Sequence, residues 1–270
     1  MTVSVVLLQY NLHRLTLTAL KSVLESDLHP EEILIVDNGS QPKEKEQISR
    51  HLEPTLRLIE LPQNLGYVKG TNAGWKEATG DYIVLCNNDI ALSRQCLRRL
   101  KLGMDQYPDL GWLCASYTQG DWAHCIVSPP SEVAETLQAS GGRSRESFNQ
   151  WTEGLGDSPK IVYATNTEAT VFMVRKSLSD QIGYFWDELV WHQDFDYAIR
   201  VRQAGYQVAV SRNAVFWHAR GHPTVKLAEG DGSLQAYREP LTRSDQLMLD
   251  KYGPNWRYNP RYQDQGHHKL

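Results

Sequence analysis

Residues 3–9 read VSVVLLQ, an almost uninterrupted apolar run. Runs of this kind are typical of strands that are buried on both faces of a parallel sheet. Apolar residues then recur at helical spacing at Leu12, Leu15, Ala19 and Val23. A buried strand followed by a helix predicts the first half of a βαβ unit, and therefore a parallel sheet.

The same alternation continues as far as residue 116. The further predicted strands cover residues 32–36, 56–61, 82–86 and 110–115. The further predicted helices cover residues 43–51, 71–78 and 93–107. Because strands and helices alternate at this spacing, we predict an α/β fold with a Rossmann-like mixed central sheet flanked by helices.

Residues 117–160 interrupt this pattern, because they are rich in Gly, Ser and Pro. We interpret them as a variable loop over a site, since long irregular segments are usually functional or disordered. Regular segments resume at residues 169–175, 177–182, 194–204, 206–210 and 214–217, and one more helix is predicted at residues 242–252. We therefore predict one domain over residues 1–222, with halves at 1–116 and 117–222, and a C-terminal helical extension over residues 223–270.

The composition is that of an ordinary globular protein. The chain has 270 residues, with 28 Lys and Arg against 32 Asp and Glu and a formal net charge of -4, which argues against a nucleic-acid partner. Hydrophobic residues at 41% and charged residues at 22% exclude disordered and fibrous classes. No apolar run reaches the roughly 18–20 residues that span a bilayer, and no signal peptide is visible. Four cysteines without CxxC spacing suggest reduced thiols, so we expect a cytoplasmic protein with at most peripheral contact at the inner face of a membrane.

Polar side chains follow three of the predicted strands. They are Gln9 and Asn11 after the first strand, Asp37 and Asn38 after the second, and Asn87, Asn88 and Asp89 after the fourth. Each cluster alone is common turn chemistry. Ligands on an open α/β sheet bind beyond the carboxyl ends of its strands, where all three clusters would lie. Together the clusters favour a ligand site over three unrelated turns.

The segment Asn64–Gly74 reads NLGYVKGTNAG and leads into a predicted helix. Glycines let backbone N–H groups approach a ligand closely, and a helix N-terminus attracts phosphate. The segment matches neither the Walker A loop nor the GxGxxG motif. A tight turn with close helix packing explains the glycines equally well.

Further positions carry candidate chemistry. Asp89 offers oxygen to a hard divalent cation such as Mg²⁺ or Mn²⁺ on a diphosphate. His218, after an apolar strand, is the best placed of the nine histidines for a metal. Asp194 and Asp196 stand two residues apart at the start of a predicted helix, so their side chains point in different directions. One of them can face a cleft while the other caps the helix or pairs with Arg200.

In order along the chain, these segments resemble the family 2 glycosyltransferases of the GT-A fold, nearest their rhamnosyltransferase-like branch. The matching segments are VVLLQYN at 5–11, IVDNGS at 35–40, NLGYVKGTNAG at 64–74, GDYIVLCNND at 80–89, QDFD at 193–196 with Arg200 and Gly205-Tyr206 after it, and VFWHARG at 215–221. The ordered combination covers roughly residues 3–222 and is more specific than any single segment. It implies a single GT-A domain and an inverting enzyme that displaces a nucleoside diphosphate in one step.

The resemblance also implies roles for individual residues. Asp37 would hydrogen-bond the pyrimidine base of a nucleotide-diphospho-sugar. Asp89 would hold Mn²⁺ or Mg²⁺ on the diphosphate, with His218 as the second protein ligand, and Asp194 would be the base that deprotonates the acceptor hydroxyl. The other donor-binding residues implied are Gln9, Asn11, Asn38, Gly66, Lys69, Asn72, Asn87 and Asn88. The acceptor-binding residues implied are Trp191, His192, Gln193 and Thr170.

Two positions depart from the family pattern. Gln193 stands where the family usually has a Glu before the base, so a neighbouring charge is lost. The metal motif keeps only one carboxylate, that of Asp89, which weakens the metal site by inspection.

Several alternatives stay open at the level of the sequence. A UDP- or dTDP-sugar is the favoured donor and a GDP-sugar is a further option, while the acceptor is a glycan, a lipid-linked, a protein or a small-molecule hydroxyl. A nucleotidyltransferase on a similar fold would carry a Gly-rich basic loop near its N-terminus, and residues 10–14 contain no glycine. A catalytically inactive nucleotide-sugar-binding module is the other alternative, and Gln193 is the feature that supports it.

Overall fold

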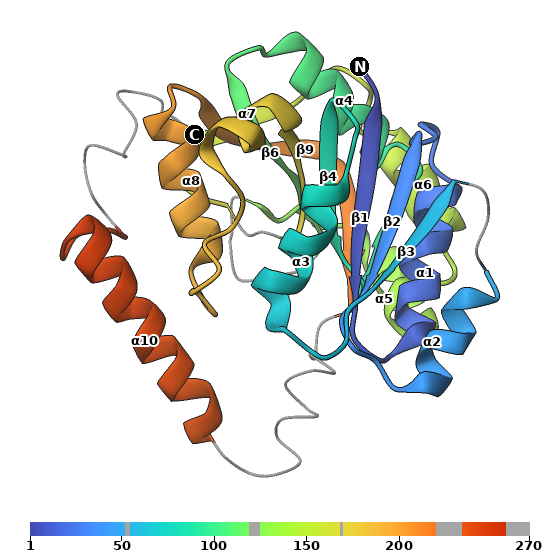
Figure 1. Cartoon of the computed structure of the whole chain (residues 1–270). Coiled ribbons are helices and arrows are strands. Elements are labelled where there is room, and N and C mark those ends of the chain that lie inside the picture. Colours follow the sequence, from blue (N-terminus) through green and yellow to red (C-terminus); the bar gives the residue numbers. More distant parts are fainter. Residues whose placement is uncertain (52–54, 119–124, 168–169, 220–233, 258–270) are drawn as a thin grey trace.

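A computed structural model of the chain describes residues 1–51, 55–118, 125–167, 170–219 and 234–257. Over these residues the chain forms a mixed α/β fold with a nine-stranded central sheet flanked by helices (Figure 1). The strands are β1 (Val3–Gln9), β2 (Glu32–Asp37), β3 (Leu56–Glu60), β4 (Tyr82–Asn87), β5 (Ile90–Leu92), β6 (Leu110–Tyr117), β7 (Ile161–Ala164), β8 (Val171–Arg175) and β9 (Gln207–His218). The helices are α1 (His13–Leu24), α2 (Pro42–Ser49), α3 (Gly66–Glu77), α4 (Cys96–Gln106), α5 (Ser131–Ser140), α6 (Glu146–Glu153), α7 (Lys176–Ile182), α8 (Gln193–Gln203) and α10 (Leu234–Tyr252).

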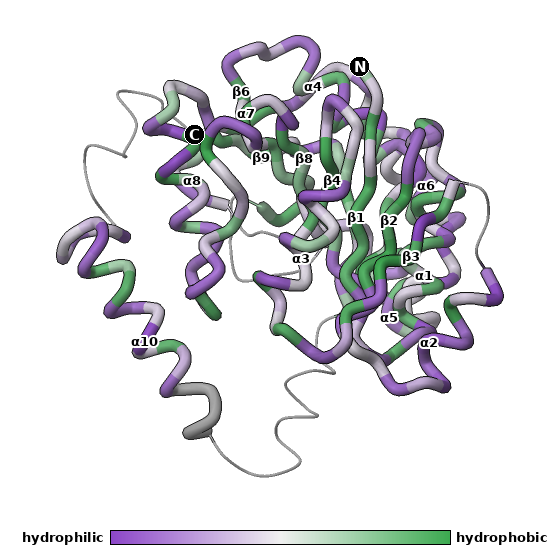
Figure 2. Tube along the Cα trace, viewed as in Figure 1, coloured by the Kyte–Doolittle hydropathy of each residue, from purple (hydrophilic) through white to green (hydrophobic). Residues whose placement is uncertain are grey.

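The strands follow the spatial order β3-β2-β1-β4-β8-β6-β9-β5, and β7 also pairs with β9. The first four strands form the parallel half of the sheet, as the alternation of strands and helices predicted. These central strands are strongly hydrophobic, whereas the helices around them carry much of the polar surface (Figure 2). The register pairs Gln9 with Asp37, and Leu8 with Asn87. Three of the predicted polar clusters therefore meet at one edge of the sheet.

Helix α3 begins at Gly66, so the predicted start at residue 71 is wrong. A Cβ atom at Gly74 would come within 2.4 Å of Val36 Cγ2, and one at Gly70 within 2.7 Å of Leu8 Cδ1. The two glycines thus let the helix lie directly on β1 and β2. Close helix packing, and not a loop ahead of the helix, accounts for much of this glycine pattern.

Strand β9 is continuous where the sequence predicted two strands, at residues 206–210 and 214–217. The interruption is a bulge, because the register against β6 shifts between Ala115 and Ser116. Two short strands that were not predicted, β5 and β7, pair with β9. With three and four residues, they are too short to show an alternating pattern.

Part of the segment predicted as a loop at residues 117–160 is helical, so that expectation is wrong. Residues 119–124 of the segment lie outside the described residues. Helices α5 and α6 contribute to a separate cluster of buried side chains made of Ala91, Val133, Leu137, Phe148, Val215 and Trp217. Gly141 and Gly142, which suggested a loop, have φ values of 59° and 77° and end α5. They are therefore the turn between two packed helices.

Helix α10 is longer than the helix predicted at residues 242–252. It packs beside α8 (Figure 1), and the shared cluster contains Leu189, Ile199, Met248 and Trp256. The expected domain boundary at residue 222 lies outside the described residues. The C-terminal extension is thus in direct contact with the helix that carries the candidate base.

Among the described residues, no helix combines the length and the apolar character needed to cross a membrane. All four cysteines belong to the described part of the chain and are buried, and no disulfide joins them.

Candidate active site

Gln9 and Asp37 meet where β1 and β2 end. Gln9 Nε2 donates to Asp37 Oδ2 at 3.1 Å, and the backbone N–H of Ser40 donates to Asp37 Oδ1 at 2.9 Å. Lys45 Nζ lies 3.5 Å from the same Oδ1, and both Gln9 and Asp37 are fully buried. The structure therefore brings these two predicted donor-site residues together as a hydrogen-bonded pair.

Asn11 and Asn38 connect the loops around this pair. Asn11 has a φ of 54°, its N–H donates to the hydroxyl of Ser40 at 2.7 Å, and its Oδ1 accepts the N–H of Gln41 at 3.0 Å. Asn38 Nδ2 donates to the carbonyl oxygen of Gly66 at 3.1 Å, which ties the end of β2 to the start of α3. Both asparagines thus shape the loops at the carboxyl edge of the sheet.

The other predicted donor residues of α3 lie in two different settings. Lys69 is exposed and borders a cavity of about 650 Å³ between α3 and β3. Asn72 is buried, and its Nδ2 donates to the carbonyl oxygen of Phe185 at 2.7 Å and to Asp187 Oδ1 at 2.6 Å. Asn72 therefore joins α3 to the segment that precedes α8.

Asp89 and His218 are brought together by the pairing of β5 with β9. Asp89 Oδ2 lies 3.3 Å from His218 Nε2, and the two side chains are 12% and 5% exposed. Two neighbouring ligands of an octahedral ion at about 2.1 Å lie about 3 Å apart, so this pair fits a divalent cation with a mixed oxygen and imidazole ligand set. Among the described residues no group of three or more His, Cys, Asp or Glu could hold a metal.

Asn87 and Asn88 directly precede Asp89, and Asn87 contacts Thr170. The N–H of Asn87 donates to the carbonyl oxygen of Thr170 at 3.1 Å, and Asn88 Nδ2 donates to the hydroxyl of Thr16 at 3.1 Å. The side-chain oxygen Oδ1 of Asn87 is buried and has no hydrogen-bond partner among the described residues. Burying a polar atom without a partner costs free energy, which makes this oxygen a candidate acceptor for a ligand donor.

Asp194 and Asp196 diverge at the start of α8, as the sequence predicted. Asp194 Oδ1 accepts the N–H of Phe195 at 3.0 Å, and its side chain is partly exposed. Asp196 is fully buried, and Arg200 Nη2 donates to its Oδ2 at 2.6 Å. The predicted pairing of Asp196 with Arg200 is therefore confirmed.

Tyr67 is a buried residue on the first turn of α3 that the sequence analysis did not single out. Burial raises the pKa of the Tyr67 phenol far above its usual value, and the charges of Asp194 and Asp89 raise it further. Both carboxylates therefore lie within electrostatic reach of one side chain on the first turn of α3. Its position directly after Gly66, in a segment already recognised, is the only sequence signal that could have indicated it.

Three of the four predicted acceptor residues, Trp191, His192 and Gln193, lie just before or at the start of α8, whereas Thr170 lies buried just before β8. The N–H of Trp191 donates to the hydroxyl of Ser244 at 3.2 Å, and His192 Nε2 lies 3.0 Å from Asp245 Oδ1. Burial lowers the pKa of His192. Gln193 Oε1 is buried and has no hydrogen-bond partner in the described part of the chain. Contacts from α10, which no motif suggested, therefore surround the segment that leads to Asp194.

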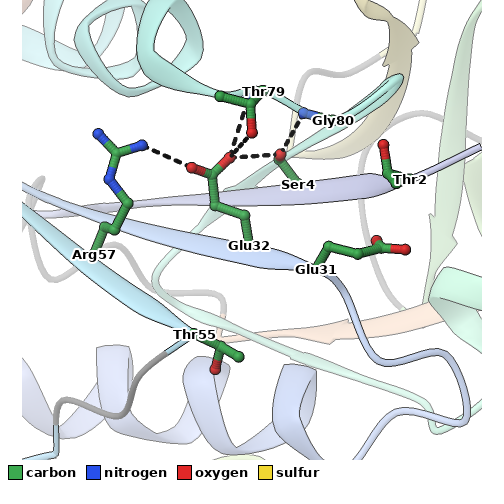
Figure 3. A pocket seen from close by; sticks show the side chains of 8 residues that line it. All are labelled: Thr2, Ser4, Glu31, Glu32, Thr55, Arg57, Thr79 and Gly80. Carbon is green, nitrogen blue, oxygen red and sulfur yellow. Dashed lines mark hydrogen bonds and ion pairs between the residues drawn. The ribbon is translucent and has the colours of Figure 1, made fainter.

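A second cavity, of about 300 Å³, lies at the opposite edge of the sheet, at the amino ends of β1 and β2 (Figure 3). Glu32 in its wall accepts hydrogen bonds from the hydroxyl of Ser4 at 2.7 Å, from the N–H of Thr79 at 3.0 Å and from Arg57 Nη1 at 2.7 Å (Figure 3). Ligands on such sheets bind beyond the carboxyl ends of the strands, whereas this cavity lies at the amino ends. Its wall is also held by hydrogen bonds within the protein, so we do not count it as part of the candidate active site.

Part of the chain matches a known family. Residues 4–130 match the model of the family described as Glycosyl transferase family 2. The chain is also 25% identical over 200 residues to "Uncharacterized glycosyltransferase YwdF" of Bacillus subtilis (strain 168), which covers 74% of this chain and 68% of that protein.

Solved structures show the same architecture. TarS 1-349 from S. aureus has a TM-score of 0.59 at 17% identity, covering 81% of this chain and 60% of that chain. The mannosyltransferase PcManGT from Pyrobaculum calidifontis, solved with GDP-Man and Mn²⁺, has a TM-score of 0.59 at 17% identity, covering 89% of this chain and 64% of that chain. These likenesses confirm the predicted GT-A fold. The chain spans less than two thirds of the length of both structures.

Proposed function

We propose that this chain is an inverting glycosyltransferase that moves a sugar from a nucleotide-diphospho-sugar to an acceptor hydroxyl in a single displacement. The observation that carries the proposal is the pair formed by Asp89 and His218 at the carboxyl edge of the sheet, with Asp89 Oδ2 3.3 Å from His218 Nε2. Asp194, a partly exposed carboxylate in the first turn of α8, is suited to take a proton. The match of residues 4–130 to the family 2 model supports the same activity.

Asp194 would act as the general base. As the acceptor oxygen forms a bond to the anomeric carbon, the carboxylate takes the hydroxyl proton, and the bond from that carbon to the diphosphate oxygen breaks. Attack from the face opposite the leaving group inverts the configuration of that carbon. A sugar hydroxyl is a poor nucleophile, so a positioned base contributes about 10²–10⁴-fold to the rate.

Asp89 and His218 would hold a divalent cation, either Mn²⁺ or Mg²⁺. When bound, such an ion offsets the negative charge that develops on the leaving diphosphate. Asn87, whose buried Oδ1 has no hydrogen-bond partner among the described residues, would accept a hydrogen bond from the donor sugar. The three residues together would orient the donor for attack.

The nucleotide would bind at the ends of β1 and β2. Asp37 would accept the N3–H of uracil or thymine, so we favour a UDP- or dTDP-sugar. TarS has been solved with UDP-GlcNAc and PcManGT with GDP-Man, so a GDP-sugar belongs in any donor panel. The residues assigned to the remainder of the donor site are Gln9, Asn11, Asn38, Gly66, Lys69, Asn72 and Asn88.

The acceptor would be a glycan, a lipid-linked or a small-molecule hydroxyl compound. Trp191, His192, Gln193 and Thr170 would line its site. Membership of the rhamnosyltransferase-like branch, a role in polysaccharide biosynthesis, and a cytoplasmic location with peripheral membrane contact belong to the same proposal.

A panel of nucleotide-sugars tested with Mn²⁺ separates the competing functions. We expect one donor to raise the melting temperature and to release nucleoside diphosphate slowly by hydrolysis, and faster when an acceptor is added. An inactive binding module would show the thermal shift without release. A nucleotidyltransferase would release pyrophosphate from a nucleoside triphosphate, and either outcome would refute the proposal.

A further inference from the structure

The C-terminal helix α10 contacts three successive residues just before α8. The hydroxyl oxygen of Ser244 accepts the N–H groups of Val190 and Trp191, both at 3.2 Å. Asp245, the next residue of α10, places its Oδ1 3.0 Å from His192 Nε2. Two adjacent side chains of α10 therefore contact all three residues of the turn that leads into α8.

The backbone of this turn is strained at His192. Its φ is 66°, a left-handed conformation that few non-glycine residues adopt, although histidine adopts it more often than most, and the surrounding contacts hold it in place. The ring lies 4.9 Å from the ring of Trp256 and 5.9 Å from that of Phe195, measured between centroids. The carbonyl oxygen of His192 accepts the N–H of Asp196 at 3.0 Å, which begins α8. The strained residue thus sets the direction in which the helix starts.

A second group of contacts from α10 binds Asp196, two residues after Asp194. Lys251 Nζ and the Tyr252 hydroxyl each donate to Asp196 Oδ1 at 2.7 Å. Arg200 Nε donates to Oδ2 of the same carboxylate at 2.8 Å. In the sequence, Asp194 therefore lies between two residues that α10 contacts, His192 and Asp196.

We propose that α10 is a positioning element for Asp194, with Ser244 and Asp245 as its positioning residues. The proposal rests on the function proposed for Asp194. Both side chains act through the turn at residues 190–192. A reacting group displaced by about 1 Å can cost up to about 10²-fold in rate, so loosening this turn slows sugar transfer. Donor affinity should stay nearly constant, because Asp37 and Asp89 belong to other elements.

The variants Ser244→Ala and Asp245→Asn test this role. With saturating donor, we expect kcat for transfer to fall about fivefold to fiftyfold, while the dissociation constant of the nucleoside diphosphate changes less than about twofold. Hydrogen exchange at the amides of Val190 and Trp191 should become faster in Ser244→Ala. A purely structural role would lower the melting temperature and leave kcat of the folded protein unchanged.

Asp250→Asn is the matched control, because Asp250 lies exposed on the same helix and its carboxylate accepts a bond from Gln246 Nε2 at 2.7 Å, within α10 itself. Values of kcat for Ser244→Ala and Asp245→Asn that match this control would overturn the inference and leave the proposed function intact. A wild-type chain that binds donors and makes no product would instead overturn the proposed function and the inference with it. Slower transfer with unchanged donor affinity supports both.

Discussion

Asp89 and His218 face each other across the β5–β9 pair, with Asp89 Oδ2 3.3 Å from His218 Nε2. The backbone fixes this arrangement, because Ile90 pairs with His218 and the N–H of Ala219 donates to the carbonyl oxygen of Asp89 at 2.8 Å. Two side chains far apart in the sequence are thereby held at a distance that suits a shared cation.

Replacing Asp89 by alanine should abolish metal-dependent turnover and leave the fold intact. The remaining imidazole of His218 would bind a divalent ion only weakly, since carboxylate oxygen is the ligand that suits Mg²⁺ and Mn²⁺. Release of nucleoside diphosphate across a Mn²⁺ titration measures the effect. Asp180→Asn, which removes an exposed carboxylate that Lys176 pairs with on α7, is the control. Full activity of the wild type in excess chelator would contradict this prediction.

Asp194→Asn should lower turnover by about 10²–10⁴-fold, because the amide keeps the shape of the side chain and cannot accept a proton. Donor affinity should barely change, since the base contacts the acceptor. Asp196→Asn should instead lower the melting temperature, because Arg200 and Lys251 would lose their charged partner, at a cost of about 1–3 kcal/mol. Both variants are measured with the same donor and acceptor. An active Asp194→Asn beside an inactive, well-folded Asp196→Asn would reverse the two roles.

Asp37→Ala should weaken binding of UDP or dTDP about ten- to hundredfold, the effect of losing a charge-assisted hydrogen bond. Calorimetry at a temperature where the variant is folded measures this change. Asp37 also accepts bonds from Gln9 and from the N–H of Ser40, so the melting temperature should fall as well. Lys45→Ala is the control, because it removes the partly exposed cation near Asp37 and keeps the carboxylate. Unchanged nucleotide affinity in Asp37→Ala would make Asp37 a turn residue only.

The parallel half of the fold was predictable because its strands are buried on both faces. Such strands appear in the sequence as apolar runs, as at residues 3–9 and 32–36. Parallel strands also end at a common edge, so the meeting of the polar clusters that follow β1, β2 and β4 was predictable from the order of the elements. The divergence of Asp194 and Asp196 was predictable from helical geometry alone.

The features that the sequence did not predict depend on contacts between distant elements. The Gly, Ser and Pro content of residues 117–160 predicts a loop, whereas Gly141 and Gly142 form the turn between α5 and α6, with Gly142 against Trp217. Tyr67 was not singled out, because its burial and the influence of Asp194 and Asp89 on its pKa arise only when distant segments pack together. Ser244 and Asp245 have no local pattern that indicates a role, since it arises only when α10 packs against the turn before α8.

The stability of the protein should depend on pH through His192. Burial lowers its pKa below the usual 6.5, Arg257 lowers it further, and the charge of Asp245 raises it in part. As the pH falls through about 6.5, the unfolded chain binds a proton at this position that the folded chain does not, so the free energy of unfolding falls until the folded pKa is reached. Above pH 7 His192 is neutral in both states and contributes no slope.

His192→Asn isolates this effect from the other eight histidines, since asparagine tolerates the left-handed φ of 66° and has no proton to bind. Denaturant unfolding at several pH values between 5 and 8 should give a wild-type free energy that drops more steeply below pH 6.5 than that of the variant. In Asp245→Asn the free energy of unfolding should fall further below pH 6.5 than in the wild type, because the variant lacks the charge that favours the protonated ring. His13→Asn is the control for a histidine with a carboxylate partner, because His13 Nδ1 lies 2.7 Å from Glu44 Oε2. Parallel pH curves for wild type and His192→Asn would show that the buried ring carries no protonation penalty.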